Sequence, residues 1–251
     1  MNKVAIITGS CGGIGKALVN AYIEDGYFVI GLDKKSPENI DSKSYFALSI
    51  DLLSFAKNKE HRLVVIDEIY QHLPRVINDL VLINNAAEQI IKSAKDITWE
   101  DWEHSLGVNV LAPFFLIQAL SESLAINRGH VVNVTSIHAK LTKPGFICYA
   151  TSKAALESIT RSLALELSPL GISVNAVAPA AIATEMLLAG FVDEPQKLRE
   201  LKNFHPAKVV GKPEEIASFI KSITDHKSAF LTGAVLEFSG GIGGRLHDPN
   251  D

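Results

Sequence analysis

Residues 3–15 read KVAIITGSCGGIG, and this stretch decides how the rest of the chain is interpreted. Its first half, residues 3–8, is a short apolar run rich in β-branched side chains, which is typical of a strand buried on both faces of a parallel sheet. The glycines that follow lead directly into a helical pattern over residues 14–25. Such a turn lets the backbone approach a ligand closely, and the helix that begins there offers N–H groups and a positive dipole end. The stretch therefore predicts a phosphate-binding loop.

The remainder of the chain continues the alternation of strands and helices. Apolar runs and helical spacing predict the strands 3–8, 27–32, 46–50, 80–84, 130–135, 172–178 and 235–238. Helices are expected at 14–25, 61–73, 99–105, 110–126, 149–167 and 213–223, with Gly107 separating the two in the middle. This order predicts one α/β domain over residues 1–251, a doubly wound, Rossmann-type parallel sheet of seven strands with helices on both faces.

Three connections stand out from this pattern. Residues 34–45 leave room for at most a short helix in the second crossover. Residues 180–206 form a long connection, which inside a compact domain is more often a functional lid than a plain linker. The tail, 240–251, is either a frayed terminus or a segment that reaches a neighbouring subunit.

Composition narrows the class of partner. The net charge is -4 and no long basic block occurs, so we expect neither nucleic acid nor an anionic membrane as partner, but a small molecule. Two cysteines are too few for a disulfide framework, and the apolar run after Lys3 is too short for a signal peptide, so we expect a reducing cytoplasm. Polar residues and a proline interrupt the longest apolar stretch, residues 108–120, so no membrane segment is predicted.

Asp33 ends the second predicted strand, 18 residues after Gly15. An acidic side chain at this spacing is expected to accept hydrogen bonds from an adenosine ribose and to repel a 2′-phosphate, which favours NAD over NADP. Lys34 and Lys35 follow and would soften that preference. The alternative interpretation of Asp33 is a turn residue at a strand end.

Tyr149 and Lys153 are four residues apart, so on a helix the phenol and the ammonium share a face. A cation beside a tyrosine hydroxyl favours the phenolate and lowers its pKa toward a range useful for proton transfer. An amphipathic surface helix would show the same pair by accident. Ser136, 13 residues before Tyr149, adds a hydroxyl at the end of the fifth strand, where it would otherwise cap the strand.

Together these features resemble the short-chain dehydrogenase/reductase family in its compact form, over residues 3–243. The chain departs from the family's pattern at Ala87 and Ala180, where glycine is usual, and in its short second crossover. The matching motifs are Thr8-Gly9-x-x-x-Gly13-x-Gly15, Asp51-Leu52, Asn84-Asn85-Ala86, Asn109, Ser136, Tyr149 and Lys153.

The resemblance implies a cofactor site for NAD, with NADP less favoured. Its residues would be Gly9, Gly13, Ile14, Gly15, Asp33, Asp51, Leu52, Asn85, Ala86, Tyr149, Lys153, Pro179, Ile182 and Thr184. In such a site Asp51 meets the adenine ring, Asn85 and Ala86 line the adenosine ribose, and residues 179–184 hold the nicotinamide amide and a nearby phosphate.

The resemblance also implies the catalytic roles. Ser136 would hydrogen-bond the substrate oxygen, Tyr149 would give or take its proton, and Lys153 would tune Tyr149 and bind the nicotinamide ribose. Asn109 would support a water that relays protons toward Lys153, or be a satisfied buried amide, and the two are compatible. No metal ion is expected. A homodimer or homotetramer is implied, paired through the helices 110–126 and 150–167.

The substrate is the least defined part. Glu88, His138, Lys140 and Lys143 suggest a polar, sugar-like or acidic substrate, although a solvated loop would carry the same residues. Met186 would contribute apolar cover from the predicted lid.

Three functions compete at this point. The first is an NAD-dependent enzyme that interconverts a secondary alcohol and a ketone on a small polar substrate by hydride transfer. The second is an NADP-dependent reductase of carrier-bound acyl chains, against which Asp33 argues. The third is a non-catalytic NAD-sensing module, which would have no need of Ser136, Tyr149 and Lys153 together.

Overall fold

The computed structural model describes residues 2–35, 43–192, 194–226 and 228–245, without the side chain of Met186. Its strands are β1 (Lys3–Thr8), β2 (Phe28–Asp33), β3 (Tyr45–Ser49), β4 (Asp79–Asn84), β5 (His130–Val134), β6 (Ser173–Pro179) and β7 (Val235–Phe238). Its α-helices are α1 (Gly13–Glu24), α2 (Leu52–Lys57), α3 (Lys59–His72), α4 (Trp99–Leu106), α5 (Ala112–Ile126), α6 (Ile147–Leu167), α7 (Glu185–Ala189), α8 (Pro195–Phe204) and α9 (Pro213–Asp225).

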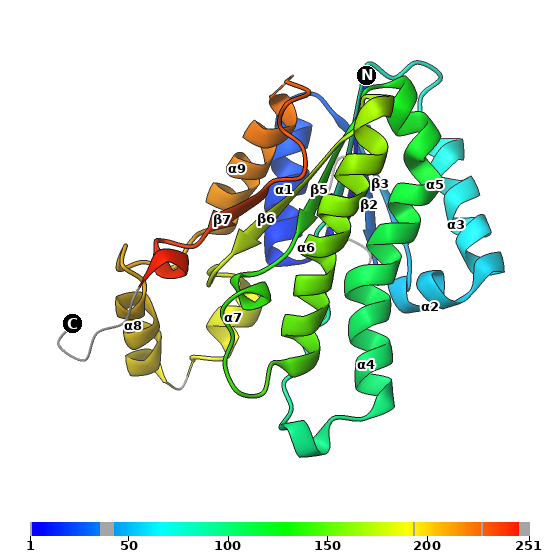
Figure 1. Ribbon diagram of the computed structural model, residues 1–251. Coiled ribbons are helices and arrows are strands. Elements are labelled where there is room, and N and C mark those ends of the chain that lie inside the picture. Colours follow the sequence, from blue (N-terminus) through cyan, green and yellow to red (C-terminus); the bar gives the residue numbers. More distant parts are fainter. Residues whose placement is uncertain (1, 36–42, 193, 227, 246–251) are drawn as a thin grey trace.

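All seven strands form one parallel sheet in the order β3-β2-β1-β4-β5-β6-β7 (Figure 1). β1 lies near the middle, where Ile6 pairs with Ile30 on one side and with Leu82 on the other. Every parallel connection needs a crossover, and helices supply them. The predicted single-domain, doubly wound α/β fold is confirmed.

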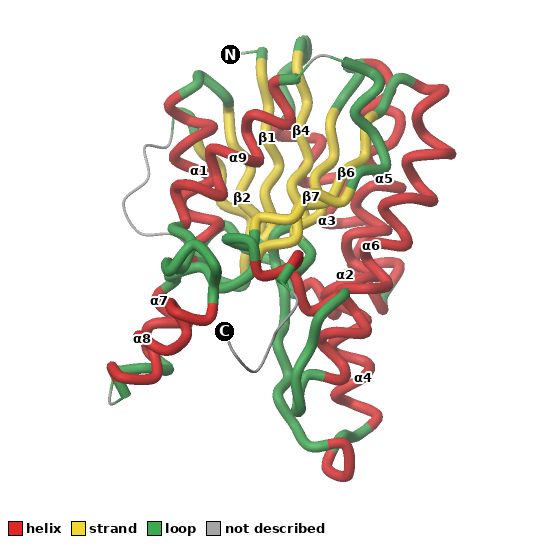
Figure 2. Tube along the Cα trace, turned by 60° about the vertical axis from the view of Figure 1, so that its left-hand side comes forward, coloured by secondary structure: helices red, strands yellow, loops and turns green. Residues whose placement is uncertain are grey.

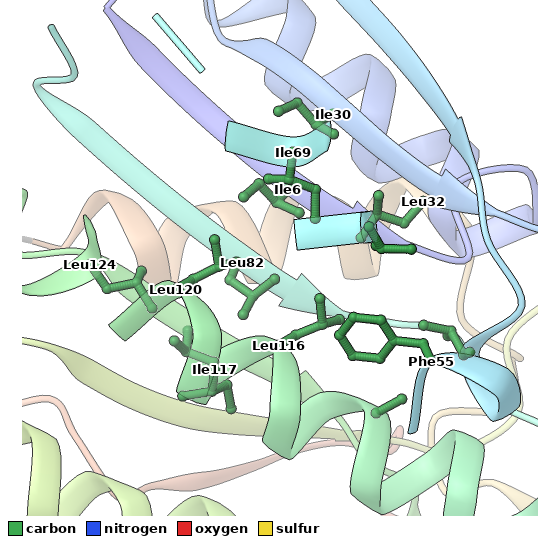
Figure 3. Close-up of a cluster of buried hydrophobic side chains, with 14 of the residues drawn as sticks. Ile6, Ile30, Leu32, Phe55, Ile69, Leu82, Leu116, Ile117, Leu120 and Leu124 are labelled. Carbon is green, nitrogen blue, oxygen red and sulfur yellow. The ribbon is translucent and has the colours of Figure 1, made fainter. Parts of the chain in front are cut away.

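Helices cover both faces of the sheet, as the tube view shows (Figure 2). Val4 and Ile6 of β1 pack into a core with α3 and α5, whereas Ala5 and Ile7 pack on the other face with α1 and α9. In the first of these cores Ile6, Leu82 and Leu116 lie close together (Figure 3). The continuous apolar character of residues 3–8 thus follows from burial on both faces.

The prediction that Gly107 separates two helices is wrong. Residues 99–126 run as one helical stretch in which the π-helical turn Gly107–Leu111 joins α4 to α5. A Cβ on Gly107 would lie 2.5 Å from Leu53 Cδ1, so the glycine allows α2 to pack closely instead of ending a helix. α2 itself was not predicted, because six residues are too few for a clear period.

The same stretch, Trp99–Ile126, is long and apolar enough to cross a membrane by length and composition, since an 18-residue window within it has a mean hydropathy of 1.4. Its apolar side chains Leu116, Ile117, Leu120 and Leu124 are fully buried against the sheet. Packing in the core of the domain therefore accounts for part of this hydrophobicity, since 44% of the apolar window is buried.

Several elements lie beyond the carboxyl ends of the strands. The connection 180–206 contains α7 and α8, which sit apart from the two main layers (Figures 1 and 2). That it acts as a lid stays a prediction. Most of the second crossover, residues 36–42, and the end of the tail, residues 246–251, lie outside the described part of the chain.

Candidate active site

The site lies where the carboxyl ends of β1 and β4 meet. From β1 the strand order continues to β2 and β3, whereas from β4 it continues to β5, β6 and β7. Such a reversal opens a crevice at the carboxyl ends of the strands, which is the usual ligand site of a doubly wound sheet. The loops that follow β1, β4, β5 and β6 border this crevice.

The glycine loop after β1 is packed so tightly that side chains do not fit. Gly9 has φ +66°, and a Cβ there would lie 2.9 Å from Ala86 Cα. A Cβ on Gly15 would overlap the carbonyl oxygen of Gly9. α1 starts at Gly13 with no acidic side chain in its first turn, and the half-buried Ile14 packs against the core. The positive end of α1 therefore faces the crevice in the way that binding of a phosphate requires.

The segment after β6 closes over this loop. β6 ends at Pro179, and Ile182 is buried and pairs with Gly211 in an isolated bridge. A Cβ on Gly13 would lie 2.9 Å from Thr184 Cβ, so Thr184 sits directly on the start of α1. The structure thus brings the predicted residues after β6 next to the glycine loop.

A groove of about 690 Å³ opens beside Gly13 and Thr184 and runs outward between α1 and α9. Neither Tyr149 nor Lys153 lines it. The groove adjoins the glycine loop but is separate from the proton-transfer residues.

Asp33 stands at the end of β2 beside the glycine loop. Its carboxylate accepts N–H hydrogen bonds from Cys11 (2.9 Å) and Lys35 (3.0 Å), which hold it at the rim of the crevice. The ammonium of Lys34 lies 3.6 Å from the carboxylate of Asp51, so this cation is engaged away from Asp33. A negative charge therefore borders the site where a ribose is expected.

Asp51 also has a local structural role. Its carboxylate accepts the N–H groups of Leu53 (2.9 Å) and Ser54 (3.4 Å) and so caps α2. Leu52 is buried in the core beneath it. The adenine contacts implied for Asp51 and Leu52 stay predictions.

Asn85 and Ala86 fasten the loop after β4 to the end of β1. The side-chain amide of Asn85 donates to the carbonyl oxygens of Thr8 (2.9 Å) and Gly9 (3.2 Å). The Thr8 hydroxyl accepts the backbone N–H groups of Asn85 (2.9 Å) and Ala86 (3.0 Å). These two residues therefore shape the crevice through its backbone.

Three side chains converge after β5. Ser136, 6% exposed, follows the strand, and Tyr149 and Lys153 lie one turn apart on α6. The ammonium of Lys153 donates to the carbonyl oxygen of Val134 (2.8 Å), and its Nζ lies 5.7 Å from the centroid of the Tyr149 ring. The Ser136 hydroxyl oxygen accepts the His138 N–H (3.2 Å), which leaves its own hydrogen for another acceptor.

The expected lowering of the Tyr149 pKa by Lys153 is corrected by the structure. Burial raises the pKa of Tyr149, and a hydrogen bond with Ser136 offsets this only in part. Burial also lowers the pKa of Lys153 to about 7, so its ammonium is only partly charged at neutral pH. Since Lys153 Nζ lies 5.7 Å from the centroid of the Tyr149 ring, the protonation states of the two side chains depend on each other.

Asn109 lies in the π-helical turn and is fully buried. Its amide oxygen accepts the Glu88 N–H (2.8 Å), and its amide nitrogen donates to the Glu88 carbonyl (2.9 Å) and to the Ser152 hydroxyl (2.9 Å). The side chain is therefore a satisfied buried amide. The water relay implied for Asn109 stays a prediction.

His138 reaches the proton-transfer residues. Its ring stacks on Phe146 with centroids 4.4 Å apart and an interplanar angle of 3°, and its centroid lies 5.9 Å from that of Tyr149. Its Nδ1 is 3.2 Å from the hydroxyl oxygen of Thr142. Burial and the nearby charge of Lys143 lower the pKa of His138.

The other residues predicted for the substrate are placed differently. The carboxylate of Glu88 lies 3.1 Å from His104 Nδ1 on α4, and Lys140 pairs with Glu237 of β7 at 3.1 Å. Met186 lies in α7, and its side chain is outside the described part of the structure.

Some residues of the site escaped prediction. Phe146 supports His138, and Ser152 joins Asn109 to the Tyr149 carbonyl through a 2.8 Å hydrogen bond. A buried chain of amides also links β4, β5 and α6, because Asn84 donates to Asn133 and Asn133 donates to Thr160. The asparagines are visible in the sequence at strand ends, but nothing in their spacing shows which partner each finds.

Comparison with known proteins decides the family. A model of the family described as short chain dehydrogenase matches residues 3–193. The chain belongs to this family.

Relatives of this short-chain dehydrogenase span nearly its whole length. It is 31% identical to an NAD-dependent glycerol dehydrogenase of Listeria innocua, over 96% of this chain and 93% of the relative. Ligand-free aldohexose dehydrogenase of Thermoplasma acidophilum superposes with a TM-score of 0.87 at 27% identity, over 99% of this chain and 97% of that chain. The protein ElxO with NADP bound has a TM-score of 0.87 at 25% identity, over 98% and 100%.

The residues of this short-chain dehydrogenase fit a nicotinamide cofactor. The glycine loop leaves room where a Cβ would overlap backbone, and the positive end of α1 has no acidic side chain to repel a diphosphate. Among residues 2–35, 43–192, 194–226 and 228–245, no cluster of His, Cys, Asp and Glu side chains suited to a metal ion occurs. The chain is an NAD(P)-dependent dehydrogenase acting on CH–OH groups.

Proposed function

We propose that this dehydrogenase uses NAD and interconverts a secondary alcohol and a ketone on a small polar, sugar-like substrate. The observation that carries the proposal is the convergence of Ser136, Tyr149 and Lys153 beside a crevice bordered by Asp33. The names of a glycerol dehydrogenase and an aldohexose dehydrogenase among similar proteins support a polyhydroxy substrate.

The preference for NAD rests on Asp33. Its carboxylate is fixed by two backbone N–H groups, so it cannot swing away from a 2′-phosphate without losing both. The ammonium of Lys34, which would otherwise attract such a phosphate, is paired with Asp51. A 2′-phosphate bound beside the Asp33 carboxylate would place two negative charges together, which disfavours NADP.

The chain's own residues perform the proton chemistry. In the direction of oxidation, a nicotinamide cofactor held in the crevice would supply the hydride acceptor for the carbon that carries the hydroxyl. Tyr149 takes the proton of that hydroxyl, and Ser136 donates a hydrogen bond to the same oxygen while its charge changes. When Lys153 is protonated, its positive charge favours the deprotonated form of Tyr149. The Val134 carbonyl accepts a hydrogen bond from the ammonium and holds it in place.

The proposal is tested by absorbance of the reduced cofactor, with glycerol, pentitols, aldoses and hydroxy acids assayed with NAD and NADP, and a carrier-bound acyl substrate assayed with NADH and NADPH. Turnover of polyhydroxy compounds, at least tenfold more efficient with NAD, is the expected result. Efficient reduction of carrier-bound acyl chains with NADPH would instead establish the acyl reductase, and cofactor binding without any turnover would establish a sensing module.

The proposal includes a homodimer or homotetramer, paired through α5 and α6, in a reducing cytoplasm. Ile126 at the end of α5 is 76% exposed and Leu165 on α6 is 79% exposed. A second subunit packed against α5 and α6 would bury these apolar side chains, which supports the proposed pairing. A monomer mass that does not change with concentration in light scattering would contradict the oligomer.

A further inference from the structure

The helix α8 is weakly attached to the rest of the domain. None of its residues, all of which lie within the described range 194–226, is buried. The side chains of Lys197 and Arg199 bond to Glu194 and Gln196, within or beside the same helix. An element without a buried face opens at a low cost in free energy. The contacts at the two ends of α8 therefore decide how easily it moves.

The connection that contains α7 and α8 is closed onto the glycine loop at its base. The N–H of Ala183 donates to the Gly211 carbonyl (2.8 Å), and the N–H of Gly211 donates to the Ala181 carbonyl (3.0 Å). The chain that follows α8 is thus bonded to the chain that begins the connection. Thr184 lies directly on Gly13 at the start of α1. A cofactor phosphate bound at α1 would lie under this segment, so we expect cofactor release to require that the segment moves.

The C-terminal tail joins the chain that leaves α8 to the sheet (Figure 1). The carbonyl oxygen of Gly240 accepts the N–H of Ala207 (3.0 Å). Three residues further along, a Cβ on Gly243 would overlap the carboxylate of Glu237 in β7, so the tail packs closely on the last strand. The tail is therefore a fixed point from which α8 can be held.

Arg245 reaches from this tail to the last residue of α8. Its guanidinium Nη1 donates to the Phe204 carbonyl oxygen (2.9 Å), and its guanidinium carbon lies 5.8 Å from the centroid of the Phe204 ring. The last carbonyl groups of a helix have no partner within it, and the negative end of the helix dipole lies there, so a cation is favoured. The ring adds a cation–π attraction.

We infer that Arg245 is a positioning residue that fastens the end of α8 to the tail and so slows release of the nicotinamide cofactor. The inference goes beyond the proposed function, because it requires only that the dehydrogenase binds its cofactor, whatever the substrate. One hydrogen bond and one cation–π contact at an exposed position correspond to about a fivefold change in the rate constant of release.

The test measures the rate constant of NADH release by stopped-flow fluorescence, in which excess NAD displaces bound NADH. NADPH and NADP replace them if they bind more tightly. The variants are Arg245→Met, which keeps the aliphatic length without charge or donors, and Arg245→Lys, which keeps a charge and a donor. The matched control is Lys208→Met, because Lys208 Nζ donates to the Asn203 carbonyl (3.1 Å), a similar bond at the end of α8 that does not involve the tail.

Arg245→Met is expected to release NADH about fivefold faster than the wild type, Arg245→Lys to restore part of the slow release, and Lys208→Met to stay within about twofold of the wild type. Hydrogen exchange of residues 195–204 without cofactor should also be faster in Arg245→Met, which shows that α8 itself opens more often. A rise of no more than about twofold in Arg245→Met would overturn the inference, as would an equal rise in Lys208→Met. A wild type that binds NADH but oxidises none of the alcohols overturns the proposed function instead, so the two failures are distinguishable.

Discussion

The two sides of the crevice are built differently. On the cofactor side, the loop of residues 9–15 is shaped by backbone, and a Cβ on Gly9, Gly13 or Gly15 would meet other atoms at 2.9 Å or less. On the substrate side, the loop of residues 137–146 is shaped by side chains, with His138 stacked on Phe146 and Lys140 paired with Glu237. One side tolerates almost no change, and the other is adjustable.

This difference explains how one fold serves many substrates. The cofactor is the same whatever the substrate, so it can be held by a loop whose backbone fits it closely. Such a loop requires glycine at the positions where a Cβ would meet other atoms. The substrate varies, and side chains on loops can be exchanged without disturbing the sheet. Substitutions on the two sides should therefore differ greatly in their effect.

The largest effect is expected for Gly15→Ala. Its Cβ would overlap the Gly9 carbonyl oxygen, so α1 must move, and we expect a loss of about 3 kcal/mol in the free energy of unfolding, with loss of NADH binding. Gly12→Ala is the matched control in the same loop, because its Cβ would lie 3.4 Å from that oxygen. Urea unfolding and NADH fluorescence measure both. Equal stability of the two variants would show that the loop is not tightly packed.

Lys153 borders both sides, and its burial predicts a pH dependence of stability. Its pKa is about 7 when folded and 10.5 ordinarily, so between these values the unfolded state binds more protons and stability rises with pH. From pH 7 to 9 the cofactor-free wild type should gain about 2 kcal/mol relative to Lys153→Met, whose methionine does not titrate. Urea unfolding at several pH values checks this. Parallel curves for the two proteins would contradict a buried lysine of lowered pKa.

Much of the cofactor side could be predicted from the sequence, because its requirements are local. A strand, a turn and a helix that follow one another in the chain are indicated by the spacing of Gly9, Gly13 and Gly15 and by the position of Asp33. The seven strands were predicted for the same reason. Gly107 shows the limit, since its small size serves a contact with Leu53 that no local pattern reveals.

The substrate side could be predicted only as a set of candidates. His138 does lie beside Tyr149, but Glu88 faces His104 and Lys140 faces Glu237. These partners lie on α4, 16 residues from Glu88, and on β7, 97 residues from Lys140, and no local spacing shows either pairing. The pKa of Tyr149 failed as a prediction because it depends on burial, which a four-residue spacing does not show.

An intermediate effect is expected for Asp33→Asn on the cofactor side. Removing the negative charge should lower the ratio of kcat/KM with NAD to kcat/KM with NADP about tenfold, while the amide oxygen still accepts a backbone N–H. The control is Glu166→Gln, which removes the same charge from an exposed position near the C-terminal end of α6, away from Tyr149. An unchanged ratio in Asp33→Asn would remove the basis for the NAD preference.

The smallest effect is expected for Lys140→Met on the substrate side. The side chains of Lys140 and Glu237 are 64% and 34% exposed, and exposed pairs contribute less than about 1 kcal/mol. Lys197→Met on α8 breaks an exposed pair with Glu194, the N-cap of that helix, and should change thermal unfolding as little as Lys140→Met does. A loss above about 2 kcal/mol for Lys140→Met alone would show that this pair holds the substrate loop rigidly, against the contrast drawn between the two sides.

The central claim is that Tyr149 transfers the proton while a separate backbone cradle holds the cofactor. Tyr149→Phe keeps the ring beside His138 and removes only the hydroxyl, so NADH affinity measured by fluorescence should stay within about threefold of wild type. The kcat/KM for a substrate found in the panel should fall about a hundredfold or more. Turnover of Tyr149→Phe at the wild-type rate, with NADH still bound, would contradict the account.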